Sequence, residues 1–119
     1  MRTERLYVTD ILDAADSIAR FLEAIEREGF LSDELRQSAV LQKLIVIGEA
    51  ASHISAETRA QHPEIEWQDV VSFRNFAVHE YFSVNWEIVW TTATLDVPLL
   101  RKQVAAILPP ESSSSHAAQ

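Results

Sequence analysis

The sequence lacks cysteine, long apolar runs and a signal peptide, and each absence narrows the class of protein. Without cysteine, the 119-residue chain can form neither disulfides nor thiolate metal sites, which fits a reducing cytosol. No apolar run approaches the roughly 20 residues that a membrane span needs, and no signal peptide precedes Asp10. We therefore expect a cytoplasmic protein without membrane contact, built as one domain around a single core.

Positive charge is also scarce. The chain has 10 lysines and arginines against 18 aspartates and glutamates, which gives a net charge of −8. Non-specific binding to nucleic acid depends on clustered lysine and arginine, so this excess of acidic residues argues against an extended RNA-binding surface. It remains compatible with a narrow, local positive site, and it suits a basic protein partner.

Glycine and proline are few, so we expect long helices. Apolar residues spaced three and four apart predict an amphipathic helix over residues 4–28, ended by Gly29. A second apolar helix is predicted over residues 33–56, with Ser32 as its N-cap.

The rest of the chain is predicted to hold a connector and two more helices. Residues 58–67 read as a connector with about one helical turn, and a third helix begins at residue 67 or 68. Asn85 is the expected N-cap of the last helix, which Pro98 should kink. We therefore predict an all-α fold, an antiparallel bundle of four main helices plus a short connector helix. The three tryptophans are expected in its core: Trp67, Trp86 and Trp90.

The domain is expected to span residues 1–108. Pro109 and Pro110 end the last helix, and residues 109–119 contain no core-forming side chain, so this tail should be disordered.

The second helix is more apolar than one core requires. Val46 lies on its otherwise polar seam, and Gly48 would permit close approach of another helix. One interpretation is a contact with a second subunit; the other is that Val46 is an ordinary surface valine.

An arginine, an amide, a histidine and a tyrosine occur within eight residues, among apolar side chains, in the stretch Arg74-Asn75-Phe76-Ala77-Val78-His79-Glu80-Tyr81-Phe82. Arginine offers a planar charged fork that matches a phosphate, and histidine moves protons near neutral pH. On an α-helix Asn75 and His79 would share a face, so that Asn75 could orient the imidazole, whereas Arg74 would point roughly 140° away from His79. The stretch therefore makes most sense as a helix end that brings polar groups together.

The order of these residues resembles the HEPN superfamily and, within it, the HepT-like toxins that pair with a minimal nucleotidyltransferase antitoxin. The pattern Arg-Asn-x-x-x-His-x-Tyr-Phe is followed by Val84, Asn85, Val89 and Trp90, and the resemblance covers about residues 4–108. Other landmarks agree: Asp10-Ile11-Leu12, Ile47-Gly48-Glu49-Ala50-Ala51 and Pro63-Glu64-Ile65-Glu66-Trp67.

The resemblance implies a metal-independent endoribonuclease, the toxin of a type VII-like toxin–antitoxin system. In such enzymes the 2′-hydroxyl of RNA attacks its own phosphodiester. His79 would handle a proton, Arg74 would stabilise the charge on the phosphate, and Asn75 would orient either group. The family's sites are built at a homodimer interface from two copies of the motif. Tyr81 matches the tyrosine that the partner nucleotidyltransferase modifies with AMP to silence the toxin.

Other polar residues have plainer interpretations. Glu49 and Asp10 are possible supporting residues of the motif, although a solvated or ion-paired role is the ordinary one for each. Tyr81 alone would read as a buried tyrosine beside Phe82. Ser83 stands where a zinc-protease helix would need its second histidine, so we expect no metal site and no cofactor.

A second function from another class stays open. Arg74 and His79 could simply bind a phosphate, which would make the chain a non-catalytic helical module that holds nucleotide or substrate for a nucleotidyltransferase partner.

Overall fold

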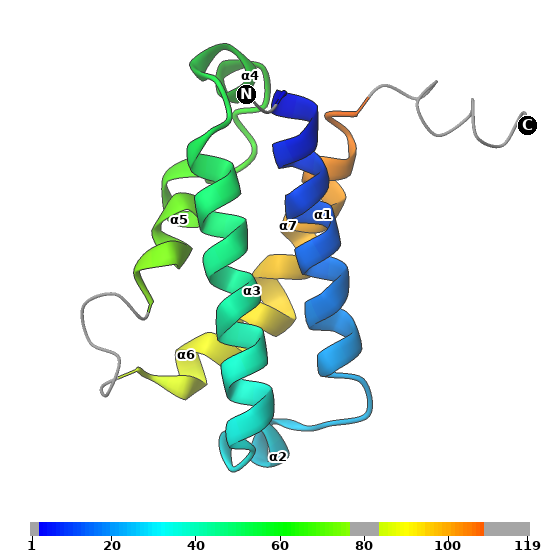
Figure 1. Ribbon diagram of the computed structural model, residues 1–119, viewed down its shortest axis with the longest axis vertical. Helices are drawn as coiled ribbons and strands as arrows, with labels where there is room; N and C mark the ends of the chain where they lie inside the picture. The colour runs from blue at the N-terminus through cyan, green and yellow to red at the C-terminus, as the bar shows by residue number, and fades with distance from the viewer. Residues whose placement is uncertain (1–2, 77–83, 109–119) are drawn as a thin grey trace, which may run out of the picture.

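The computed structural model describes residues 3–76 and 84–108, and within these ranges the chain is helical and contains no strand. This confirms the all-α prediction. No helix among the described residues is long and apolar enough to cross a membrane. The elements, labelled in Figure 1, are α1 Glu4–Phe21, α2 Arg27–Leu31, α3 Glu34–Ser52, α4 Ala56–Gln61, α5 Trp67–Val71, the 3₁₀ helix η1 Ser72–Asn75, α6 Trp86–Thr91, the π-helical turn η3 Thr92–Asp96, and α7 Val97–Ala105.

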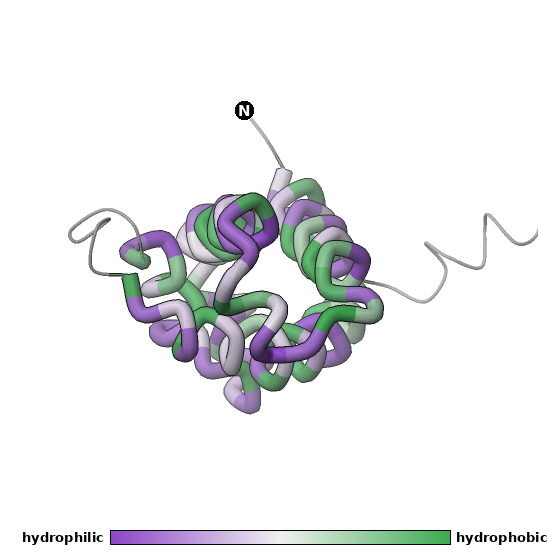
Figure 2. The backbone as a smooth tube through the Cα atoms, turned by 90° about the horizontal axis from the view of Figure 1, so that it is seen from below, coloured by the Kyte–Doolittle hydropathy of each residue, from purple (hydrophilic) through white to green (hydrophobic). Residues whose placement is uncertain are grey.

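The two longest helices, α1 and α3, run antiparallel and side by side (Figure 1). The α5–η1 segment packs on one side of α3, and α7 packs against α1 from behind. In the end-on view of Figure 2, α1 and α3 form one layer at the top of the picture, and the later segments close the bundle beneath it.

The core is made by the apolar stripes of these helices. The predicted stripe positions Ile11 and Ile18 of α1 and Leu44 and Ile47 of α3 are at most 1% exposed. Trp67 is buried as expected, whereas Trp86 and Trp90 are half-buried and pack their rings against Phe30 of α2.

The prediction of one helix over residues 4–28 is wrong. The helix ends at Phe21, Ala24 adopts a left-handed conformation at φ 60°, and α2 begins at Arg27 and contains Gly29. The terminal carbonyl oxygen of Phe21 accepts a hydrogen bond of 2.8 Å from Arg36 Nε of α3. A long-range contact therefore satisfies a helix end that no local glycine or proline marks.

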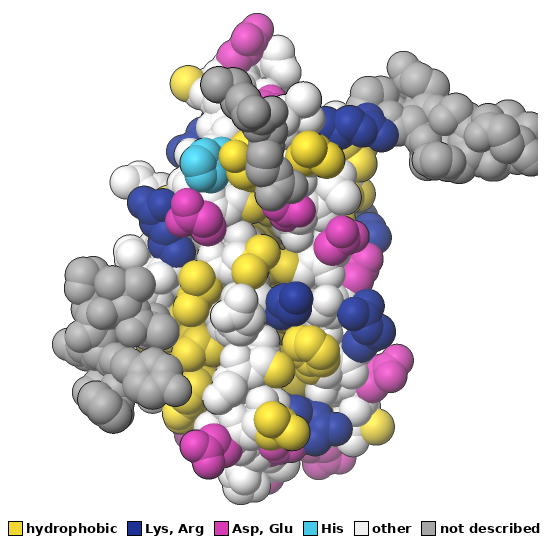
Figure 3. All heavy atoms as spheres, viewed as in Figure 1, with side chains coloured by type: hydrophobic (Ala, Val, Ile, Leu, Met, Phe, Trp, Pro, Cys, Tyr) yellow, Lys and Arg dark blue, Asp and Glu magenta, His cyan; other side chains and the backbone are white. Residues whose placement is uncertain are grey.

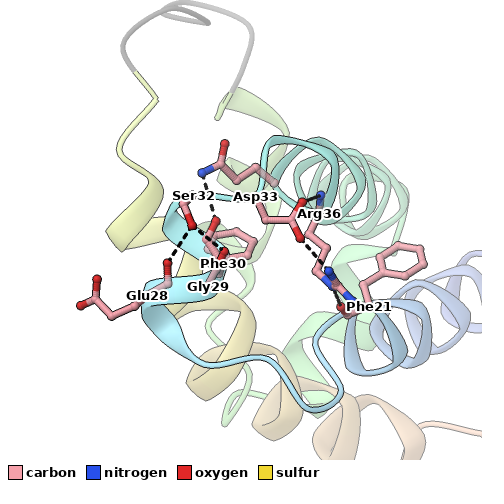
Figure 4. Close-up of polar contacts among 8 residues, drawn as sticks. Phe21, Glu28, Gly29, Phe30, Ser32, Asp33 and Arg36 are labelled. Carbon is pink, nitrogen blue, oxygen red and sulfur yellow. Dashed lines mark hydrogen bonds and ion pairs between the residues drawn. The ribbon is translucent and has the colours of Figure 1, made fainter.

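The N-cap of α3 is Asp33 and not Ser32, as Figure 4 shows. The Asp33 carboxylate accepts one hydrogen bond from the Arg36 amide at 3.0 Å and a second from its guanidinium at 2.6 Å. These two bonds, the backbone one foremost, hold the pKa of Asp33 below its usual value. Ser32 instead ends α2 and donates to the Glu28 carbonyl. The helix therefore begins one residue later than predicted, with Arg36 fixed where it can reach Phe21.

The second long helix is shorter than the predicted 33–56, because α3 ends at Ser52 and a new helix, α4, begins at Ala56. Ser55 caps α4 through the Thr58 amide at 3.1 Å. Glu4 of α1 accepts hydrogen bonds from the Ser55 amide and the Thr58 hydroxyl, and the Thr58 bond foremost lowers the pKa of Glu4. The predicted connector helix is thus present, and it is tied to the start of α1.

The last helix begins at the predicted cap, where Asn85 Oδ1 accepts from the amides of Glu87 and Ile88. The interruption expected at Pro98 takes the form of the π-helical turn η3, directly before α7. Proline lacks the N–H that would continue the α-helical hydrogen-bond ladder, which explains why the irregular turn lies just upstream. The expected tail, residues 109–119, lies outside the described residues.

Candidate active site

Arg74 is carried by a short segment, α5 followed by η1, that is anchored by its aromatic residues. Trp67 is 8% exposed, and its indole N–H donates to the carbonyl oxygen of His62 at 3.0 Å. Val70 and Phe73 are also buried. These anchors fix the backbone that leads into Arg74, so the position of Arg74 is set by the core.

Gly48 allows this segment to lie directly on α3. A Cβ atom at Gly48 would lie 2.5 Å from the Arg74 amide nitrogen and 2.9 Å from the Val71 carbonyl oxygen. Both are backbone atoms that cannot move aside alone, so no residue larger than glycine fits there. The close approach predicted for Gly48 is therefore made within this chain, against the residue expected to hold the phosphate.

Glu49, the next residue on α3, holds the Arg74 side chain. Arg74 Nη1 lies 3.2 Å from Glu49 Oε1, and the guanidinium side chain remains 42% exposed. The structure thus brings together a predicted catalytic residue and a predicted supporting residue that lie 25 positions apart in the sequence.

The chain of contacts continues past Glu49 to two aromatic rings. The other carboxylate oxygen, Glu49 Oε2, lies 3.3 Å from Nε2 of His53, one helical turn further along α3. The His53 ring stacks on Tyr7 of α1 with centroids 4.5 Å apart and an interplanar angle of 11°. Sequence reasoning missed His53 and Tyr7 as neighbours of the site. The Glu49-x-x-x-His53 spacing, which places both side chains on one helix face, was the signal that would have found His53.

Asp10, the other predicted supporting residue, lies in the same neighbourhood. It lines a shallow groove of about 260 Å³ between α1 and α3, together with Glu49 and His53. Val46 and Ile45 supply part of the apolar lining. Figure 3 shows the α1–α3 face, on which hydrophobic side chains reach the surface between charged ones.

Asn75 is exposed at the end of η1. The predicted α-helix across Arg74 and Asn75 is wrong at these positions, because residues 72–75 form a 3₁₀ helix. Ser72 Oγ donates to the Asp69 carbonyl at 2.6 Å where α5 tightens. The expected i, i+4 relation between Asn75 and His79 depends on residues 76–79, of which 77–79 lie outside the described residues, so it stays a prediction. His79 and Tyr81, the predicted proton-transfer and modification residues, lie outside the described residues.

The arrangement offers a half-exposed guanidinium, pinned at its backbone by Gly48 and at its side chain by Glu49. An arginine held in this way can take up a phosphate oxygen with little loss of side-chain freedom. Among the described residues no group of three or more histidine, aspartate or glutamate side chains could hold a metal ion.

Comparison with known proteins agrees with the resemblance seen in the sequence. Residues 11–107 match the model of the family described as "Ribonuclease HepT-like". A protein of Caldanaerobacter subterraneus named "Putative RNase" is 34% identical over 111 residues, which cover 93% of this chain and 99% of the relative. A "Probable ribonuclease HepT" of Thermococcus cleftensis is 36% identical over 100 residues, 84% of this chain and 91% of the relative. No solved structure matches the chain significantly. The chain therefore belongs to the HepT-like ribonuclease family.

Proposed function

We propose that the chain is a metal-independent endoribonuclease in which Arg74, Asn75 and His79 act on an RNA phosphodiester. The 2′-oxygen forms a bond to phosphorus, and the bond from phosphorus to the 5′-oxygen of the next nucleotide breaks. His79 carries a proton between the attacking and leaving oxygens, and Arg74 stabilises the charge on the non-bridging oxygens. The products are a 2′,3′-cyclic phosphate and a free 5′-hydroxyl.

The observation that carries this proposal is the preorganisation of Arg74. Its backbone lies against Gly48, and its Nη1 lies 3.2 Å from Glu49. A guanidinium has five N–H donors, so one end can remain on Glu49 while the others contact phosphate. Groups that are already aimed at developing charge cost little reorganisation during the reaction.

The chemistry is tested by the ends of the products. Purified protein should convert a labelled RNA into fragments with 2′,3′-cyclic phosphate and 5′-hydroxyl ends, and excess EDTA should leave the rate unchanged. Fragments with 3′-hydroxyl ends, or a rate abolished by EDTA, would refute the mechanism. Tight RNA binding without any cleavage would instead support the non-catalytic binding module.

The active form is proposed to be a homodimer that brings two copies of Arg74 near one phosphate. A second arginine would offset the weak positive charge of a single chain, whose net charge is −8. Val46 and Ile45, half-buried in the α1–α3 groove, are the apolar surface proposed for this contact. Sedimentation at tens of micromolar should give a dimer, and the substitution Val46→Arg should give a monomer. A wild-type monomer at that concentration would exclude this assembly.

In the cell the chain is proposed to be the toxin of a toxin–antitoxin pair, silenced when a minimal nucleotidyltransferase transfers AMP to Tyr81. The new phosphodiester would lie seven residues from Arg74 in sequence. It would compete with RNA for the guanidinium, because fork contacts do not distinguish one phosphodiester from another.

Regulation is tested separately from catalysis by intact-mass measurement. Co-expression with the partner nucleotidyltransferase should add one or more AMP units, and Tyr81→Phe should prevent this, whereas Tyr7→Phe should not. An unmodified wild-type chain, or a modified Tyr81→Phe chain, would contradict AMP transfer to Tyr81.

A further inference from the structure

A second hollow lies between α5–η1 and α7, apart from the α1–α3 groove. It has a volume of about 250 Å³. Its apolar lining comes from Val70 and Phe73 of the α5–η1 segment and from Leu99 and Leu100 of α7. We call this hollow the α5–α7 groove.

Carboxylates surround this apolar lining. Glu64, Glu66 and Asp69 contribute from one side and Asp96 from the other, and all four are exposed. Within the described part of the chain, Glu66, Asp69 and Asp96 form no ion pair, and Glu64 lies 3.5 Å from His62 Nδ1. Among residues 3–76 and 84–108, no lysine or arginine lines the groove.

The α6–η3–α7 segment, which supplies Leu99 and Leu100 to the lining, exposes large apolar side chains. Leu99 is 57% exposed, Leu95 is 66% exposed and Ile88 is 52% exposed, and all three lie on the continuous α6–η3–α7 segment. Exposed large apolar side chains on a segment that lines an apolar groove are typical of an interaction surface.

The apolar lining and the carboxylates around it together indicate which kind of side chain binds in the groove. An arginine side chain can lay its aliphatic stem on an apolar floor while its guanidinium meets carboxylates at the rim. The groove is smaller than the roughly 300–1,000 Å³ clefts that hold drug-sized ligands, so it suits one or two side chains of a protein segment. RNA would be repelled by the four carboxylates, and a second copy of this acidic chain is a poor electrostatic match.

We propose that the α5–α7 groove is a docking site for a basic, partly apolar segment of a partner protein, with an arginine inserted between Asp69 and Asp96. The site is independent of the nuclease proposal, but Phe73 in its lining is the residue before Arg74. A segment docked there therefore contacts the same short helix that carries the proposed phosphate-binding residue.

The test uses the full chain and a short fluorescent peptide in which arginine and leucine alternate. The double variant Asp69→Asn/Asp96→Asn should bind this peptide about tenfold more weakly than wild type. A matched control, Glu23→Gln/Glu57→Gln, changes the net charge equally on exposed residues outside the groove and should bind within about twofold of wild type. Equal weakening in both double variants would overturn the proposal, because bulk charge alone would then explain binding.

A second variant and a map complete the test. Leu99→Arg places a positive charge in the groove at an exposed position, so the fold should persist while peptide binding falls at least tenfold. Amide shifts on peptide addition should cluster at residues 64–73 and 96–103. Shifts centred on the α1–α3 face, or a Leu99→Arg variant that loses self-association and not peptide binding, would overturn the assignment.

Discussion

Two neighbouring residues of α3 hold Arg74 from different directions. Gly48 accommodates its backbone, and Glu49 pairs with its guanidinium at 3.2 Å. Because one contact is steric and the other electrostatic, single substitutions separate them. Each contact of Arg74 can therefore be tested by its own variant.

Replacing Gly48 with alanine should destabilise the fold and abolish cleavage. The new Cβ would lie 2.5 Å from the Arg74 amide nitrogen, so η1 must move away from α3. We expect a loss of about 1–3 kcal/mol in the free energy of unfolding, as for overpacked cores, measured by urea denaturation. In Gly29→Ala the nearest atom, at 2.9 Å, belongs to the flexible Ile25 side chain. That control should be neutral or slightly stabilising, and equal stabilities of the two variants would contradict this role of Gly48.

Replacing Glu49 with glutamine should slow cleavage and at the same time strengthen RNA binding. The amide keeps the shape of Glu49 but loses the charge that fixes Arg74, and misplaced catalytic groups cost on the order of tenfold to a hundredfold in rate. Removing a negative charge beside the phosphate site should lower the Kd for RNA in a fluorescence anisotropy titration. Glu57→Gln, the same charge change on α4, is the control. An unchanged kcat would show that Glu49 is only a surface carboxylate.

The sequence predicts which residues form the site, but it does not give their contacts. The order of Arg74, Asn75 and His79 predicts phosphodiester chemistry, and this assignment stays a prediction. The pairing of Arg74 with Glu49 spans 25 residues and depends on how closely η1 approaches α3, which no local pattern encodes. The stacking of Tyr7 on His53 joins two helices and was equally beyond the reach of periodicity.

At the scale of the helices, the apolar periodicity predicted the existence of each long element but not its ends. The apolar stripe predicted a helix that continues to Gly29, yet α1 ends at Phe21. There Arg36 of α3 donates a hydrogen bond to the carbonyl oxygen of Phe21. Asn85 was predicted correctly because its cap is local, made with amides two and three residues ahead. Tertiary contacts thus decide the helix ends that sequence reasoning placed wrongly.

The contribution of the α1–α7 contact to stability can be measured by varying the pH. Asp16 accepts hydrogen bonds from Arg101 at 2.9 Å and 3.3 Å, and the bond from Arg101 holds the pKa of Asp16 below its usual value of 3.8. A lowered folded-state pKa means that the stabilisation is present above about pH 4 and is lost as the pH falls through the lowered value.

Asp16→Asn should therefore cost about 0.2–1 kcal/mol at pH 7, since both side chains are nearly half exposed. Urea unfolding at pH 3 should show a smaller difference between the variant and wild type. The exposed Asp13, on the same helix, provides the control Asp13→Asn. If the difference in stability between Asp16→Asn and wild type grows on acidification, the pKa of Asp16 is not lowered by folding.

For the whole molecule, the distribution of charge separates two surfaces. The chain is strongly acidic, with a net charge of −8, so a polyanionic substrate needs a local exception. Arg74 supplies a local positive charge beside Glu49 of α3, whereas four carboxylates surround the α5–α7 groove. The same short α5–η1 segment contributes Arg74 to the proposed nuclease site and Phe73 to the proposed docking site.

The proposal that Arg74 and His79 carry out RNA cleavage is tested most directly by comparing wild type, Arg74→Ala and His79→Ala on a labelled RNA under identical conditions. Each variant should keep the wild-type circular dichroism spectrum and lose on the order of 10²–10⁴-fold in kcat/KM. The control Arg27→Ala, which removes a similarly exposed arginine paired with Glu28 and Glu87, should retain cleavage. Wild-type rates in either Arg74→Ala or His79→Ala would contradict the assignment of this site.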